Sequence, residues 1–285
     1  MKNIKFLSVI MVAVLLIGSF SGCGDDGFPV KIGDTEVTAP PARVAVLSEQ
    51  AASAIFALGY KSYLVGAPSE FLTTEIPGVT DLGNSMFIDF DKVYELAPDL
   101  IIAPAELTDT IKNNLASRNI KLVELKTPMK YSEVAPYYEA LSKIFLGEIK
   151  YTEAYDPFMG EAERIIAETK TALNGITKKV ALFIEEGYVA TGDTIAGEAM
   201  KKAGMINIAD GETAYMMSAK AIREADPEII FCPEGLSETI MNFESYKNIT
   251  AIKNGAVYEV DVEALIYASE GFAATLQGMS KYLLQ

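Results

Sequence analysis

The sequence predicts an α/β protein of two similar lobes with mostly parallel sheets, bridged by a long helix, with a ligand cleft between the lobes. Two stretches 129 positions apart nearly repeat each other: VYELAPDLIIAPAEL from Val93 and IREADPEIIFCPEGL from Ile222. Each reads as a helix end, a proline that stops the helix, and an apolar run of strand length. Strand and helix patterns alternate around both copies, which favours parallel sheets.

The first 22 residues read as a lipoprotein signal peptide rather than as part of the fold. Lys2 and Lys5 precede an apolar run of 15 residues, shorter than the ~18 expected of a membrane-spanning helix. The ending Phe20–Cys23 resembles the bacterial lipobox, which implies lipidation of Cys23. Residues 23–36 then read as a tether, and we expect export and anchoring on the outer face of the cell membrane. The other interpretation is an ordinary signal peptide with an incidental cysteine.

Residues 37–130 form the predicted N-terminal lobe. Asp89 is a plausible N-cap for the helix that leads into the first copy of the repeat. Expected strands are 43–47, 64–67, 100–103 and 121–125, and expected helices are 51–58, 90–96 and 108–118.

Residues 131–176 form the predicted bridge, and residues 177–285 the C-terminal lobe. The bridge has apolar positions at a helical period, Gly147 divides it, and Pro157 is expected to kink or restart its second helix. In the C-terminal lobe we expect strands at 180–184, 229–232 and 256–260, and helices at 194–202 and 267–284.

Composition excludes several function classes. Two of the 24 basic residues precede Cys23, so the chain from Cys23 onward has 22 basic and 39 acidic residues and a net charge of −17. This charge disfavours nucleic acid and anionic lipid as partners. Histidine is absent, which removes the usual general base and the Ser-His and Cys-His nucleophile systems. P-loop, GxGxxG and GxSxG motifs are absent too. We therefore expect neither an enzyme nor a cofactor, and we expect Cys232 to be a buried thiol.

The order of phrases resembles the substrate-binding proteins of ABC importers for metal chelates, the class that serves ferric siderophores, haem and cobalamin. The resemblance covers nearly the whole mature chain. The matching phrases are RVAVLSEQAASAIFALGY from Arg43, FDKVYELAPDLIIA from Phe90, AIREADPEIIF from Ala221 and AIKNGAVYEVD from Ala251. It implies two α/β lobes that hinge only slightly, a monomer, and delivery of the ligand to an ABC permease and its ATPase.

In that family each lobe carries an exposed carboxylate that docks onto permease arginines. Asp91 occupies the matching place in the first lobe, although a carboxylate in a first helical turn also suits the helix dipole. The matching position in the second lobe is Lys220. Glu224, one turn further on, is the substitute that we expect, unless docking is asymmetric.

Ligands of such a protein bind at the carboxyl ends of the strands. The side chains expected there are aromatic, thioether and acidic, together with one amide, and none is an arginine. They are Glu49, Gln50, Glu70, Phe71, Met86, Phe87, Glu106, Met129, Tyr188, Tyr215, Met216, Glu234 and Tyr267.

This set of side chains favours a broad, neutral or cationic ligand. Anionic siderophores are normally bound by arginine or lysine side chains, and free zinc or manganese by histidines. We expect a corrinoid such as cobalamin or cobinamide first, a neutral ferric siderophore next, and haem last, since the usual axial histidine is missing. The alternative is a surface lipoprotein of the same fold that acts as an adhesin or sensor without transport.

Overall fold

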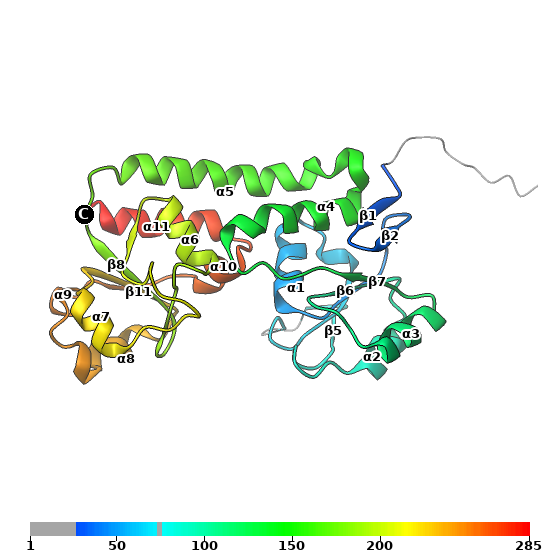
Figure 1. The fold of residues 1–285 in the computed structure, drawn as a ribbon, viewed down its shortest axis with the longest axis horizontal. Helices are drawn as coiled ribbons and strands as arrows, with labels where there is room; N and C mark the ends of the chain where they lie inside the picture. The colour runs from blue at the N-terminus through cyan, green and yellow to red at the C-terminus, as the bar shows by residue number, and fades with distance from the viewer. Residues whose placement is uncertain (1–26, 73–75) are drawn as a thin grey trace, which may run out of the picture.

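The computed structural model describes residues 27–72 and 76–285, which form two α/β lobes joined by a pair of helices (Figure 1). The predicted signal peptide and Cys23 lie outside the described residues. Within these two ranges no helix is long and apolar enough to cross a membrane.

The N-terminal lobe is built on a five-stranded parallel sheet in the order β5-β4-β3-β6-β7. Its central strands β3 and β6 are buried along their whole length, as their unbroken apolar sequences require. The strands are β3 (Val44–Val46), β4 (Leu64–Ala67), β5 (Thr80–Asp81), β6 (Leu100–Ala103) and β7 (Lys121–Glu124), and the helices are α1 (Glu49–Ala57), η1 (Lys61–Tyr63), α2 (Phe90–Leu96) and α3 (Asp109–Ser117).

The C-terminal lobe has a parallel sheet in the order β10-β8-β11-β12, with β9 antiparallel to β8. Its strands are β8 (Lys179–Glu185), β9 (Tyr188–Val189), β10 (Ile206–Asn207), β11 (Ile229–Cys232) and β12 (Val257–Glu259). Its helices are α6 (Ile195–Lys202), α7 (Ala219–Ala225), α8 (Ser237–Asn242), η3 (Glu244–Tyr246), α9 (Thr250–Lys253), α10 (Val262–Tyr267) and α11 (Phe272–Leu283). The thiol of Cys232 is buried, as predicted.

The duplicated phrase marks the same structure in both lobes. Helix α2 and strand β6 recur 129 positions later as α7 and β11. Both helices carry a side-chain N-cap, Asp89 and Ser218, and both end at a left-handed residue, Ala97 and Asp226. Because a left-handed residue followed by proline stops a helix, each copy turns directly into its buried strand.

The bridge consists of η2 (Tyr131–Glu133), α4 (Val134–Lys150) and α5 (Thr152–Ala172). Gly147 interrupts α4 with φ 75° and ψ 175°, as its position in the sequence predicted. The restart of the helix that was one of the two expectations for Pro157 does not occur, since α5 continues through it. Proline removes one backbone donor there, but the buried face with Met159 and Ile166 holds the helix against the core.

Two further expectations need correction. The tether does not reach residue 36, because β1 (Val30–Ile32) and β2 (Thr35–Val37) form an antiparallel hairpin whose apolar side chains join the core. The single helix expected over 267–284 is two helices, α10 and α11, separated at Ala268 (φ 46°) and Gly271 (φ 90°). These left-handed residues end α10 with Tyr267 at its last position.

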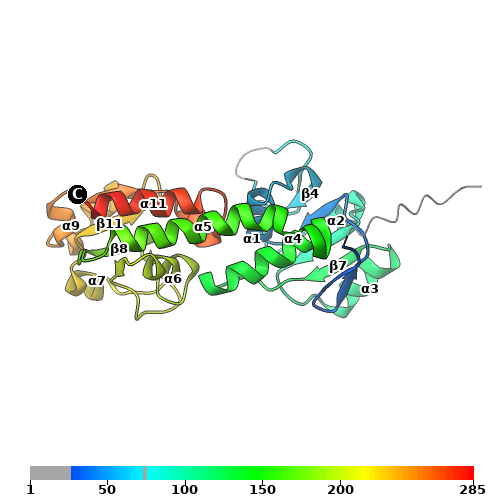
Figure 2. The same cartoon turned by 90° about the horizontal axis from the view of Figure 1, so that it is seen from above.

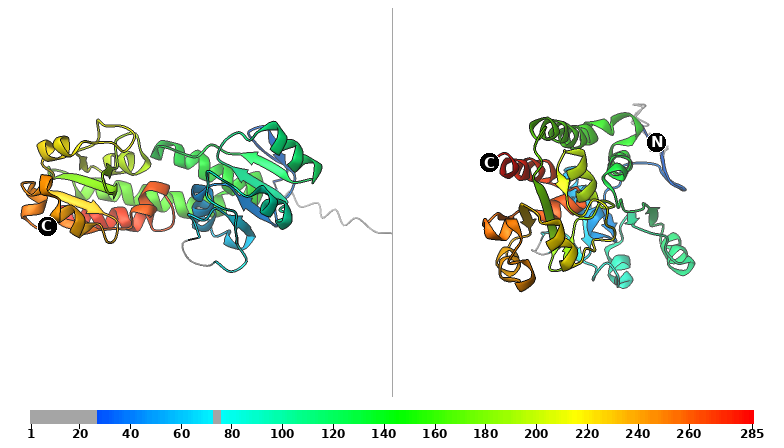
Figure 3. Two further views of the ribbon diagram at one scale, coloured as in Figure 1. Left: turned by 90° about the horizontal axis from the view of Figure 1, so that it is seen from below. Right: turned by 60° about the vertical axis from the view of Figure 1, so that its left-hand side comes forward.

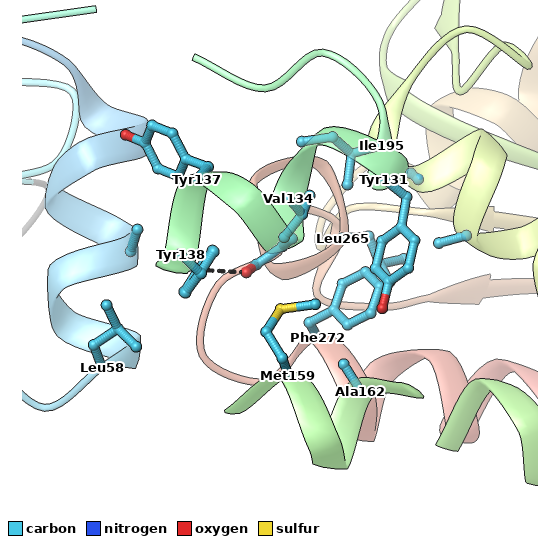
Figure 4. Close-up of a cluster of buried hydrophobic side chains, with 14 of the residues drawn as sticks. Leu58, Tyr131, Val134, Tyr137, Tyr138, Met159, Ala162, Ile195, Leu265 and Phe272 are labelled. Carbon is cyan, nitrogen blue, oxygen red and sulfur yellow. Dashed lines mark hydrogen bonds between the residues drawn. The ribbon is translucent and has the colours of Figure 1, made fainter. Parts of the chain in front are cut away.

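One apolar core runs through both lobes and the bridge. Figures 2 and 3 show α5 running along α4 and α11, with the lobes at opposite ends of the molecule. In Figure 4 the ring of Tyr131 from the bridge stacks on Phe272 from the C-terminal lobe, with ring centroids 5.4 Å apart. Tyr138 stacks on Phe158 at 4.3 Å. This shared core favours small hinge motions over wide opening of the lobes.

Candidate functional site

The lobes meet where α1 of the N-terminal lobe contacts α10 of the C-terminal lobe. The Tyr267 hydroxyl donates to Glu49 Oε2 at 2.8 Å, and Gln50 Nε2 donates to the Tyr267 carbonyl oxygen at 2.8 Å. Ser48 caps the start of α1 and so fixes the two residues that follow it. Three of the predicted ligand-binding residues therefore form one contact between the lobes, which we call the interlobe cluster.

Electrostatics at the interlobe cluster disfavour further negative charge. Burial raises the pKa of Glu49, and the nearby carboxylates of Glu263 and Glu70 raise it further against the hydrogen bond from Tyr267. Burial also raises the pKa of Tyr267, as do its bond to Glu49 and the charge of Glu263. A neutral or positive group placed here would relieve this repulsion, and an anion would add to it.

An acidic cavity of about 690 Å³ adjoins the interlobe cluster through Glu263, one of its lining residues. It lies at the carboxyl ends of β11 and β12, where ligands bind in sheets of this type. Four carboxylates line it: those of Glu234, Glu259, Asp261 and Glu263. The sequence predicted Glu234 but missed Glu263, because the expected start of the last helix lay after it.

A loop held by several hydrogen bonds brings Tyr215 to the same region. The carboxylate of Asp193 accepts hydrogen bonds from the Thr191 hydroxyl at 2.6 Å and from the Ala214 amide at 3.1 Å. The Thr191 hydroxyl in turn accepts from the Tyr215 amide at 3.1 Å. Tyr215 contributes to the raised pKa of Tyr267, which places the two phenols near each other.

Other predicted residues have structural partners in the N-terminal lobe. The Glu70 carboxylate accepts from the Ser85 amide at 3.0 Å, and this bond holds the loop that carries Met86 and Phe87. Phe71 packs edge-on against Phe56, with centroids 4.9 Å apart. Glu106 pairs with Lys112 at 3.1 Å. Glu70 therefore positions a loop and also adds charge at the interlobe cluster, whereas Phe71 and Glu106 have local roles.

The remaining predicted residues are exposed apolar side chains around the site. Met86 and Phe87 are 84% and 75% exposed, which is unusual for large apolar groups. Met129, Tyr188 and Met216 are exposed as well. Each follows, or pairs beside, the carboxyl end of a strand. Tyr188 and Met216 pair with each other in an isolated antiparallel β-bridge.

Arginine is absent from this site. Arg43 donates to the Leu96 carbonyl oxygen, Arg118 stacks on Tyr94, and Arg164 pairs with two glutamates of α5. Arg223 lies in the last turn of α7. One cation was missed by the sequence reasoning: Lys130 lies close enough to Asp193 to lower the pKa of that carboxyl, although the Thr191 hydroxyl is the larger cause.

The two docking candidates differ in their surroundings. Asp91 lies in the first turn of α2, where Asp89 rather than Asp91 caps the helix. Glu224 lies 3.7 Å from the ammonium of Lys220 on α7, and both side chains are exposed. The charge of Glu224 is therefore partly offset, whereas Asp91 forms no ion pair with the residues that the structure describes.

Comparison with known proteins identifies the family of this two-lobed chain. Residues 44–264 match the family described as "Periplasmic binding protein". The chain belongs to the periplasmic binding protein family. Members of this family are binding proteins and not enzymes, which confirms the expectation drawn from the missing histidines.

Three similar periplasmic binding proteins carry named ligands. The Fe(3+)-citrate-binding protein YfmC of Bacillus subtilis is 24% identical, over 91% of this chain and 90% of YfmC. A cobalamin-binding protein of Halobacterium salinarum is 25% identical, over 71% of this chain and 58% of its own length. The vitamin B12 binding protein BtuF of Vibrio cholerae has a similar structure, with a TM-score of 0.66, 20% identity, and coverage of 86% of this chain and 97% of BtuF.

Proposed function

We propose that this chain is an extracytoplasmic receptor, lipid-anchored through Cys23, that binds a corrinoid such as cobalamin or cobinamide and delivers it to an ABC permease. Neutral ferric siderophores come next in preference, and haem after them. The chain acts as a monomer, and residues 30–130, 131–176 and 177–285 serve as lobe, bridge and lobe.

The acidic, aromatic character of the site between the lobes supports this ligand class. Similar proteins are named for ferric citrate and for cobalamin, which differ in charge. An anionic citrate complex would meet Glu49, Glu70 and Glu263 with no arginine to balance them. Lys130 faces Asp193 and so gives little positive charge to an incoming anion.

The ligand proposal is tested by thermal shift with cyanocobalamin, dicyanocobinamide, a neutral ferric hydroxamate, haem and ferric citrate. A ligand at 100 times its Kd stabilises the folded state by about 2.7 kcal/mol, or about 5–11 °C for a chain of this size. We expect the corrinoids to give this shift. A shift with ferric citrate alone would refute the corrinoid assignment, and no shift with any compound would favour the adhesin or sensor.

Charge reversal tests the electrostatic argument directly. Glu263→Lys places a cation on the wall of the acidic cavity, and we expect it to improve binding of ferric citrate relative to the natural chain. Glu36→Lys on the exposed edge of β2 makes the same charge change away from the site. If both variants shift the ferric citrate affinity equally, the local charge of the cavity does not select the ligand.

Permease docking is tested by uptake. We propose that Asp91 contacts a permease arginine, and that Glu224 does so more weakly because Lys220 shares its charge. Asp91→Arg should abolish uptake of the bound compound while its Kd stays unchanged, and Glu224→Arg should reduce uptake less. Normal uptake by the Asp91→Arg protein would contradict this docking assignment.

A further inference from the structure

A small apolar cavity of about 150 Å³ lies within the C-terminal lobe, between the β8–β9 turn, α7, α8 and η3. None of its lining residues belongs to the interlobe cluster or to the acidic cavity. Its walls are mainly aromatic, from Phe183, Phe243 and Tyr246, with the thioether of Met217 beside them.

The three rings of this cavity form two edge-to-face pairs, and Tyr246 belongs to both. Phe183 and Tyr246 have ring centroids 6.0 Å apart with planes at 61°, and Phe243 and Tyr246 have centroids 4.8 Å apart at 69°. Ring faces carry negative partial charge and attract cations, above all alkylated ammonium groups, which shed water easily.

Polar groups at the cavity add to this preference. Glu186 supplies a carboxylate, and no lysine or arginine is among the described residues that line the cavity. The Tyr246 side chain is 5% exposed, and within the described part of the chain its hydroxyl has no hydrogen-bond partner. Burial raises the pKa of Tyr246, so the phenol stays neutral and can bond to a hydroxyl of a bound molecule.

The volume limits the guest to one compact group. An apolar protein cavity of about 150 Å³ holds a molecule the size of benzene, which is close to the size of a trimethylammonium group. We propose that this aromatic cavity is a binding site for a small methylated ammonium compound, with the cation among the three rings and Glu186 as its counter-charge. This site is independent of the corrinoid function proposed above.

The test compares choline with 3,3-dimethylbutan-1-ol, which has the same shape without the charge. Calorimetric titration of the purified mature chain should show choline binding roughly 3- to 30-fold more tightly than the alcohol, as expected for a partly desolvated cation–π site. Equal affinities would show a merely apolar cavity and overturn the proposal, as would failure of choline to bind.

Variants locate the site. Glu186→Gln should reduce the preference for choline over the alcohol without abolishing it, because the rings remain, whereas Glu185→Gln, at the neighbouring position outside the cavity, should leave the preference unchanged. Phe243→Ala removes a 43% exposed wall and should weaken both compounds, with Met241→Ala on α8 as its matched control. Choline binding that neither Glu186→Gln nor Phe243→Ala weakens would place the cation elsewhere and refute the assignment.

Discussion

Removal of the Tyr138 hydroxyl should destabilise the junction between the lobes. This side chain of α4 is fully buried, and its hydroxyl donates to the Ala268 carbonyl oxygen at 2.7 Å. Ala268 is itself 1% exposed. In the Tyr138→Phe variant its carbonyl oxygen therefore loses the hydrogen bond and has no access to bulk water. A buried polar group left without its partner costs about 1–3 kcal/mol.

The same chain provides a matched control for Tyr138→Phe. Tyr137 precedes it on α4 and is 4% exposed, yet in the described part of the chain its hydroxyl has no hydrogen-bond partner (Figure 4). Tyr137→Phe removes the same oxygen without leaving an acceptor unsatisfied. We therefore expect it to change the free energy of unfolding by less than about 0.5 kcal/mol.

Urea denaturation followed by circular dichroism measures both changes. For Tyr138→Phe we expect a lower midpoint with an unchanged slope, and a Tm lower by about 2–12 °C, taking about 2–4 °C per kcal/mol for a protein of this size. Equal stabilities for the two variants would refute the reasoning, since they would show that the bond to Ala268 contributes no more than an unpaired phenol.

The remaining predictions concern pH and glycine. Glu49 has a raised pKa, so its contribution to stability is present below about pH 4.5 and is lost as pH rises through the folded pKa. When Tm is measured against pH, the Glu49→Gln variant should not show this loss. Asp193 has a lowered pKa because Thr191 donates to it, so its contribution is lost as pH falls, and Asp193→Asn should flatten the acid limb of the same profile. Gly147→Ala should cost about 1–3 kcal/mol in urea denaturation, because only glycine adopts φ 75° and ψ 175° readily. Gly160→Ala, in open space within α5, should gain about 0.5–1 kcal/mol in that assay.

The sequence predicted the central strands and the helices before them because their signals are local. Pro98 and Pro227 stop α2 and α7, and the apolar runs that follow are buried on both faces as β6 and β11. Strands β6 and β11 and helix α2 therefore begin and end where they were expected, and α7 ends before Pro227, as the repeat indicated. The β1–β2 hairpin carried a signal too, since Gly33-Asp34 separates two alternating segments, but the expectation of a tether obscured it.

The contact between Glu49 and Tyr267 could not be predicted as a pair. Both belonged to the expected set, but 218 positions separate them and no pattern in the sequence links them. The contact depends on α10 ending at Tyr267, which it does because Ala268 adopts a left-handed conformation. Alanine gives no sign of that conformation in a sequence, unlike glycine or asparagine. The same misplaced helix boundary hid Glu263.

The bridge helps to set the geometry of the site, because it fixes the residue at which α10 stops. Tyr138 of α4 holds the Ala268 carbonyl, and the neighbouring residue Tyr267 contacts both Glu49 and Gln50 of the other lobe. A shift of α4 relative to α10 would thus move the phenol of Tyr267 directly, even with both sheets unchanged. Ligand affinity should accordingly respond to substitutions in the bridge that touch no ligand, because the bridge and the interlobe cluster are parts of one packed unit.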